Sequence, residues 1–164
     1  MKNKKLPAGT FFVELIFVAE ASAPKALQVG RFLPPTPIRV LLDKTGNNLA
    51  ENVAFDAFNN QLSAVGRQTG SKLANALQPA IHPLITKANE LAGAELVTLK
   101  AAAQEKMQTS LNEEQGRLVA LKAINPNIRD EEIQVFDKQK AQLDEFIEKA
   151  QLKLDAIRLV VVSH

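Results

Sequence analysis

The chain has 164 residues, 46% of them hydrophobic and 23% charged, with a formal net charge of +2. This length suits one domain, or one domain with an arm, and a nearly neutral charge implies no strong field for nucleic acid. The sequence contains no cysteine, which excludes disulfides and thiolate metal sites and fits a reducing compartment. No apolar run reaches the length that spans a bilayer, so no membrane association is expected.

The N-terminal third of the sequence predicts β-strands. Residues 10–20 are rich in Phe, Val and Ile, which favour strands. The lysines ahead of this segment imitate a signal peptide, but Glu14 interrupts the apolar run and favours a strand. Further strands are expected at 27–33 and 38–42. The prolines between them fix φ and donate no backbone hydrogen bond, so this connection should be extended, at a sheet edge or corner.

Turn and helix signals follow these strands. Residues 43–48 predict a turn because their glycine and asparagines tolerate positive φ, and 49–53 are expected to pair back as a short strand. A helix is predicted over 56–65. Ser71 is a good N-cap for a second short helix over 73–77.

Two long helices that fold back on each other organise the rest of the chain. The first is expected over about 84–123, because Pro79 and Pro83 should break or kink what lies before it. The Asn-Pro-Asn sequence at 125–127 ends it, and the return helix should continue to about Asp155. Apolar residues recur in both helices at a period of ~3.5, which is typical of two helices packed side by side. The predicted seam comprises Leu96, Leu99, Ala103, Met107, Leu111, Leu118 and Leu121 on the first helix, and Ile133, Phe136, Leu143, Ile147, Ala150, Leu154 and Ile157 on the second.

These elements predict an α+β fold. The β-branched residues at 157–162 should form a last strand that pairs with the N-terminal strands, so that a helical hairpin is inserted between the first and last strands of a small antiparallel sheet. We expect one domain over 1–164, with the sheet at 1–55 and 156–164, short helices at 56–82 and the hairpin arm at 83–155. The tight turn favours a hairpin closed within one chain, and therefore a monomer, over a seam that joins two chains.

A search for chemistry finds no catalytic, cofactor or metal site. Gly66, Gly70, Ser71 and Lys72 suggest a phosphate loop, but their order and spacing do not match one and no strand precedes them. The acidic run at 130–132 opens a helix, where the helix dipole favours negative charge, and does not end a strand as a magnesium-binding motif does. The two histidines, His82 and His164, lack partners at ligand spacing.

Four basic residues are the candidates for contacts with phosphate or a partner protein: Arg31, Arg39, Arg67 and Lys72. A basic patch of this kind binds the phosphate backbone of nucleic acid. Four charges scattered over forty residues more often form a solvated surface. A helical-hairpin scaffold or oligomerisation module, and a nucleic-acid-contacting accessory domain, are therefore the alternatives that the residues leave open.

Several segments together carry a family resemblance: 23–28 and 31–43 around the prolines, 59–73, the Asn-Pro-Asn-Ile-Arg-Asp sequence at 125–130, and 154–159 with the valines and histidine that follow. In this order they resemble the C-terminal region of the RapA-like RNA polymerase-associated ATPases, which belong to the SWI/SNF-type helicase superfamily.

The resemblance implies a bacterial, cytoplasmic protein that binds core RNA polymerase and promotes its recycling by ATP hydrolysis. It places ATP and magnesium in an upstream motor of two RecA-like lobes, whose motifs are absent from this chain. It therefore implies a non-catalytic C-terminal domain, with core RNA polymerase and the ATPase lobes as its partners.

Overall fold

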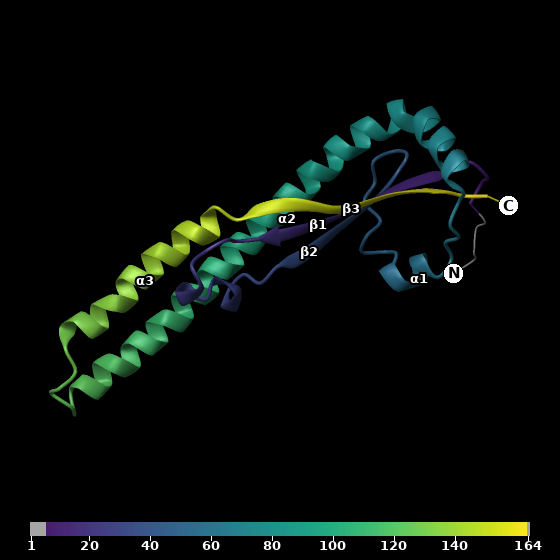
Figure 1. Cartoon of the computed structure of the whole chain (residues 1–164). Helices are drawn as coiled ribbons and strands as arrows, with labels where there is room; N and C mark the ends of the chain where they lie inside the picture. The colour runs from purple at the N-terminus through teal and green to yellow at the C-terminus, as the bar shows by residue number, and fades with distance from the viewer. Residues whose placement is uncertain (1–5, 164) are drawn as a thin grey trace. The chain divides into compact units, whose positions relative to one another are not determined.

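The computed structural model describes residues 6–163, and it has the expected α+β architecture (Figure 1). The three strands form one antiparallel sheet in the order β2-β1-β3, so the first and last strands of the chain pair as predicted. No helix in this described range is long and apolar enough to cross a membrane. The lysines that imitate a signal peptide lie outside the described residues, as does His164. In chain order the elements are β1 (Phe11–Glu20), the 3-10 turns η1 (Lys25–Leu27) and η2 (Val29–Arg31), β2 (Thr36–Asp43), α1 (Phe55–Asn59), α2 (Arg67–Lys122), α3 (Asp130–Glu148) and β3 (Gln151–Val161).

The described chain divides into two compact units. The sheet unit comprises residues 6–18, 37–94 and 154–163, and the hairpin unit comprises 19–36 and 95–153. Each unit has a buried core of its own. The expectation that 1–164 make one domain stays a prediction.

The core of the sheet unit is built on the central strand β1. Its residues from Phe11 to Leu15 are all buried, so side chains on both faces of this central strand are covered. Alternate side chains of β1 face one way, and on β2 the apolar residues Ile38, Val40 and Leu42 are also buried. In the same unit, α2 contributes a buried stripe at four-residue spacing: Leu84, Ala88 and Ala92.

Two of the predicted strands are wrong. Residues 27–33 form 3-10 turns, because Gln28 adopts a left-handed conformation (φ 50°) that ends η1 and starts η2, and its apolar neighbours Phe32 and Leu33 are buried in the hairpin unit. Residues 49–53 form turns, and only an isolated bridge between Leu42 and Asn48 extends the sheet there.

The predicted turn at 43–48 is confirmed. One carboxylate oxygen of Asp43, Oδ1, accepts hydrogen bonds from the backbone N–H groups of Thr45 (2.9 Å) and Asn47 (3.0 Å). Gly46 has φ +86°, which a residue with a Cβ rarely adopts. Burial acts to raise the pKa of Asp43, but the hydrogen bonds from Thr45 and Asn47 together lower it below its usual value.

The helices before the hairpin also differ from the prediction. Helix α1 ends at Asn59, six residues earlier than expected, and Ser71 caps nothing because it lies inside α2. Helix α2 is continuous from Arg67 to Lys122, with Pro79 and Pro83 inside it. The prediction that these prolines break the chain into separate helices is wrong, but a kink is confirmed: Figure 1 shows α2 bending in its N-terminal part.

The antiparallel hairpin of α2 and α3 is confirmed, and its turn lies at 123–129 (Figure 1). Leu111 of α2 and Leu143 of α3 belong to one buried cluster within a single chain, as the seam predicts. Lys140 links the helices by donating hydrogen bonds to Asn112 (2.8 Å) and Gln115 (3.1 Å). The cluster comprises Phe32, Leu33, Ala103, Met107, Leu111, Leu143, Ile147 and Ala150.

The predicted seam is wrong at both of its ends. Leu121, next to the hairpin turn, is 51% exposed. Helix α3 ends at Glu148 and β3 begins at Gln151, so Leu154 and Ile157 lie on a strand and remain about half exposed. The predicted strand at 157–162 is confirmed, but it starts earlier. The sequence 150–157 fits both a helical and an alternating pattern, and pairing with β1 selects the strand.

Candidate functional site: an arginine–glutamate–arginine cluster

A buried carboxylate lies at the centre of the sheet. Glu14 is on β1 between the apolar residues Val13 and Leu15, and its side chain is only 1% exposed. Burying a lone charge costs many kcal/mol, so such a group needs charged partners. The two flanking strands supply them, Arg39 from β2 and Arg158 from β3. Together these three side chains are called here the Arg–Glu–Arg cluster.

The two arginines divide the carboxylate between them. Arg39 donates from Nε to Oε2 of Glu14 at 2.8 Å. Arg158 donates to the other oxygen, Oε1, from Nε at 2.8 Å and from Nη2 at 2.5 Å. Both oxygens are thus bound by charged donors, which form stronger hydrogen bonds than neutral ones. Because Arg158 lies 144 residues from Glu14, the cluster ties the two ends of the chain's sheet together.

The segment that includes α1 closes over the cluster. Arg39 donates from Nη1 to the backbone carbonyls of Val53 and Ala50, and Arg158 donates from Nη1 to Oδ1 of Asn59 at 2.8 Å. Arginine binds well in such places because its planar fork can serve several acceptors at once.

Aromatic rings complete the cover. The guanidinium of Arg39 lies 5.6 Å from the Phe55 ring centroid and that of Arg158 lies 5.4 Å from it, within the range of cation–π attraction. Phe58 makes an edge-to-face contact with Phe12 of β1, with ring centroids 6.4 Å apart. Phe55 itself is 42% exposed, so the cover is thin.

The cluster carries a surplus of positive charge, because two guanidinium groups face one carboxylate. Nη2 of Arg39 is buried and has no hydrogen-bond partner within residues 6–163. The arrangement offers no nucleophile and no pair of groups that could exchange a proton. Its chemistry is that of an electrostatic clamp, which holds β1, β2, β3 and α1 in register.

The four predicted contact residues fall in different surroundings. Arg39 is engaged in the cluster, and Arg31, in the hairpin unit, forms an ion pair with Glu114. Arg67 and Lys72 lie in the exposed first turns of α2 and pair with no described acidic residue. A contact with phosphate or a partner therefore stays a prediction for all four, and two of them already have carboxylate partners.

Sequence reasoning missed Glu14 and Arg158 as site residues. The signal for Glu14 was present, since a carboxylate inside an apolar strand demands a cationic partner. Nothing local identified Arg158 as that partner.

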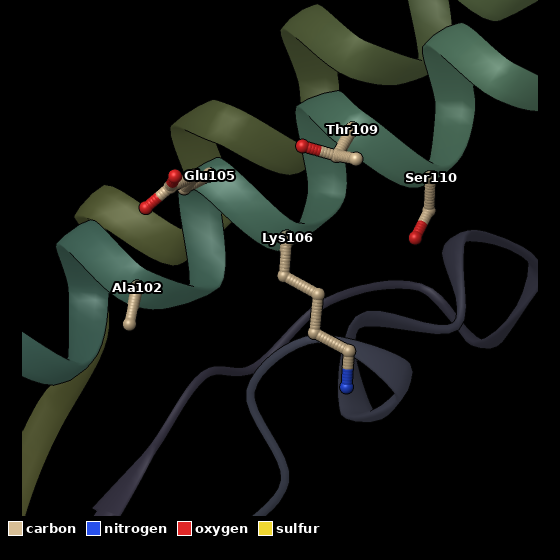
Figure 2. A pocket seen from close by; sticks show the side chains of 5 residues that line it. All are labelled: Ala102, Glu105, Lys106, Thr109 and Ser110. Atoms are coloured by element: carbon tan, nitrogen blue, oxygen red, sulfur yellow. The ribbon is translucent and has the colours of Figure 1, made fainter.

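Hollows on the surface of residues 6–163 include two in the hairpin unit. The first, about 320 Å³, is an open depression along α2. Figure 2 shows the side chain of Lys106 extending from it, and its Nζ donates to the backbone carbonyl of Arg31 at 3.2 Å. The second is lined by Glu20, Phe146 and Lys149 among others. Among residues 6–163, no group of three His, Asp or Glu side chains is placed to hold a metal ion.

Comparison with known proteins gives a consistent result. The family model of the RNA polymerase recycling family C-terminal region matches residues 1–162. The chain is 53% identical over 164 residues to the RNA polymerase-associated protein RapA of Photobacterium profundum. The alignment covers 100% of this chain but 17% of that relative, so the chain spans about a sixth of the relative's length.

Proposed function

The chain belongs to the RNA polymerase recycling C-terminal family, and from this premise we propose that it is the non-catalytic C-terminal domain of a RapA-like ATP-dependent transcription regulator. Its role is to bind core RNA polymerase, to pack on the ATPase lobes of its parent protein, and so to support polymerase recycling in the bacterial cytoplasm. The observation that carries this proposal is the match over 1–162 together with 53% identity to a RapA protein. ATP and magnesium would act in the motor of the parent, and this chain would work as a monomer.

The architecture supports a binding role. The sheet unit is clamped by the Arg–Glu–Arg cluster, and the hairpin unit has a buried apolar cluster, so each offers a rigid surface. Several large apolar side chains near the hairpin turn are exposed, including Val119 (50%), Leu121 (51%) and Ile124 (83%). Exposed apolar groups that form a contiguous patch mark sites of protein contact.

A binding measurement tests the proposal. The purified chain, immobilised in a biosensor, is exposed to purified core RNA polymerase that carries no nucleic acid. We expect saturable binding that a full-length RapA protein competes away. Binding that is absent, or that full-length RapA does not displace, would contradict the polymerase role.

An activity measurement tests the non-catalytic part. The chain should not hydrolyse ATP above background, with or without polymerase and DNA. ATP turnover that co-purifies with the folded chain through two further columns would overturn this part of the proposal.

A further inference from the structure

One face of the sheet is only partly covered within the sheet unit. Glu14 accepts hydrogen bonds from Arg39 of β2 and Arg158 of β3, so the three side chains lie on one face of the sheet. On β3 the backbone N–H of Val162 donates to the carbonyl of Thr10 at 2.8 Å, which agrees with Glu14 lying opposite Arg158. Two residues further along, this register places Ala156 beside Ile16, and Pro37 lies on the same face of β2 because it is two residues from Arg39.

One more step along the same face places Leu154 beside Val18. Pro37 and Leu154 are exposed, Leu154 at 49%, and the other members are partly buried. These residues form what is called here the apolar strip: Ile16, Val18, Pro37, Leu154 and Ala156.

The cover provided by α1 does not reach this strip. Phe58 packs on Phe12, and Phe55 lies over the two arginines. The contacts of Phe55 and Phe58 therefore lie at Glu14 or further toward Phe12, and not toward Ile16. The other side chains of β1, at Phe11, Val13, Leu15 and Phe17, are all buried. The strip is therefore the part of this face that stays open to a partner.

The positive charge at the end of the apolar strip indicates which charge a partner should carry there. The Arg–Glu–Arg cluster borders the strip and carries one surplus positive charge, and the side chain of Arg158 is 33% exposed. A carboxylate placed beside Arg158 would be attracted, and a cation would be repelled. The side chains of the strip offer no hydrogen-bond donors, so the strip suits apolar side chains and not a phosphate backbone.

We propose that the apolar strip is a docking surface for a segment of core RNA polymerase that presents apolar side chains followed by a carboxylate, which pairs with Arg158. This inference rests on the proposed function, which supplies the partner, and it adds the surface and the chemistry of the contact. The apolar side chains cover Ile16, Ala156 and Leu154. The carboxylate balances the surplus charge of the cluster.

Three substitutions test the surface against core RNA polymerase free of nucleic acid. Leu154→Glu removes an apolar contact and adds a charge of the partner's sign, so binding should weaken by about tenfold or more. Leu154→Lys removes the same contact but attracts a carboxylate, and should weaken binding less. Val97→Glu is the matched control: it changes a side chain that is 66% exposed on α2, and should alter binding by no more than about twofold.

The outcomes separate the inference from the proposed function. If the unaltered chain binds polymerase and Leu154→Glu binds equally well, the docking surface is refuted and the proposed function stands. If Lys and Glu at this position weaken binding equally, or if Val97→Glu weakens it as much, the inference is also refuted. If the unaltered chain does not bind polymerase, both fail.

A melting temperature and a photocrosslink distinguish lost binding from lost folding. If Leu154→Glu lowers the melting temperature, the test passes to p-benzoylphenylalanine at position 154, which should crosslink to a polymerase subunit on irradiation. Crosslinks only between copies of this chain would show that a second copy occupies the strip, and would overturn the proposal.

Discussion

Replacing Glu14 by Gln should destabilise the sheet unit by about 3–5 kcal/mol. The substitution keeps the size of the side chain but removes the charge that two arginines share. Arg39 has a side chain only 16% exposed, so its guanidinium cannot recover its hydration without opening the sheet. Removing one partner of a buried ion pair costs this amount because the remaining charge is left uncompensated.

The hydrogen bonds of Glu14 give an independent value for this free-energy cost. Glu14 accepts three charge-assisted hydrogen bonds, and a hydrogen bond to a charged group contributes roughly 1.5–3 kcal/mol. Gln still accepts at one oxygen, but its amide nitrogen would point donor against donor at the other arginine. Losing one or two such bonds gives a cost in the same range.

The assay must report on the sheet unit alone, because the helices dominate far-UV circular dichroism. Hydrogen exchange of the β1 and β3 amides provides that report. Glu14→Gln should raise their exchange rates by a factor that corresponds to the predicted loss, and should leave the amides of α3 unchanged. The matched control is the triple variant Glu14→Leu, Arg39→Met, Arg158→Leu, which strands no charge and should cost far less than Glu14→Gln. A loss below about 1 kcal/mol in Glu14→Gln would refute the clamp.

Three further predictions concern other parts of the molecule. Leu143→Asp buries a charge in the hairpin seam and should lower the stability of the hairpin unit by several kcal/mol. Hydrogen exchange of the α3 amides should become faster while the β1 amides keep their protection, and unchanged α3 protection would contradict the seam. Gly46→Ala should lower the unfolding free energy by roughly 1–2 kcal/mol in urea titrations, because φ is +86° there; a neutral result would contradict the turn. The hydrogen bonds that lower the pKa of Asp43 stabilise the folded state at pH values above the unfolded pKa of 3.8, and this stabilisation is lost as the pH falls through the lower folded pKa. Asp43→Asn should therefore flatten the loss of stability between about pH 5 and pH 2. A variant with the same acid profile as the unaltered chain would contradict this role of Asp43.

The elements predicted best are those with a strong local period. Residues 10–20 were expected as a strand and form β1 from Phe11 to Glu20, because a β-branched and aromatic run has few alternatives. The seam placed Leu111 and Leu143 together because helical spacing and a tight turn fix which residues meet.

The elements predicted worst are those that tertiary contacts decide. Residues 27–33 have strand-like composition, but Phe32 and Leu33 are buried against the helical hairpin and the backbone folds into 3-10 turns to place them there. Pro79 and Pro83 are strong helix breakers on local grounds, yet α2 continues through them with a bend.

The candidate site could not be predicted from local sequence because its residues are far apart in the chain. Glu14 could be recognised as anomalous, but its partner Arg158 is 144 residues away and only the pairing of β3 with β1 brings it near. The basic residues selected from the sequence included Arg39 for its charge and not for this pairing. Sequence could therefore indicate that the sheet held a charged group, and not which residues would neutralise it.

The cluster also accounts for how β3 finds its register. None of the residues of β3 is fully buried, so apolar packing alone specifies its alignment weakly. A slip of one residue would turn Arg158 to the opposite face and leave Glu14 with one partner. A slip of two would bring Ala156 or Val160 beside the carboxylate, with the same loss. Because an unpaired buried carboxylate is so costly, the Glu14–Arg158 contact selects one alignment, and that alignment is what brings Ala156 and Leu154 beside Ile16 and Val18. The charges that clamp the sheet thereby also position the apolar strip that we propose as the docking surface.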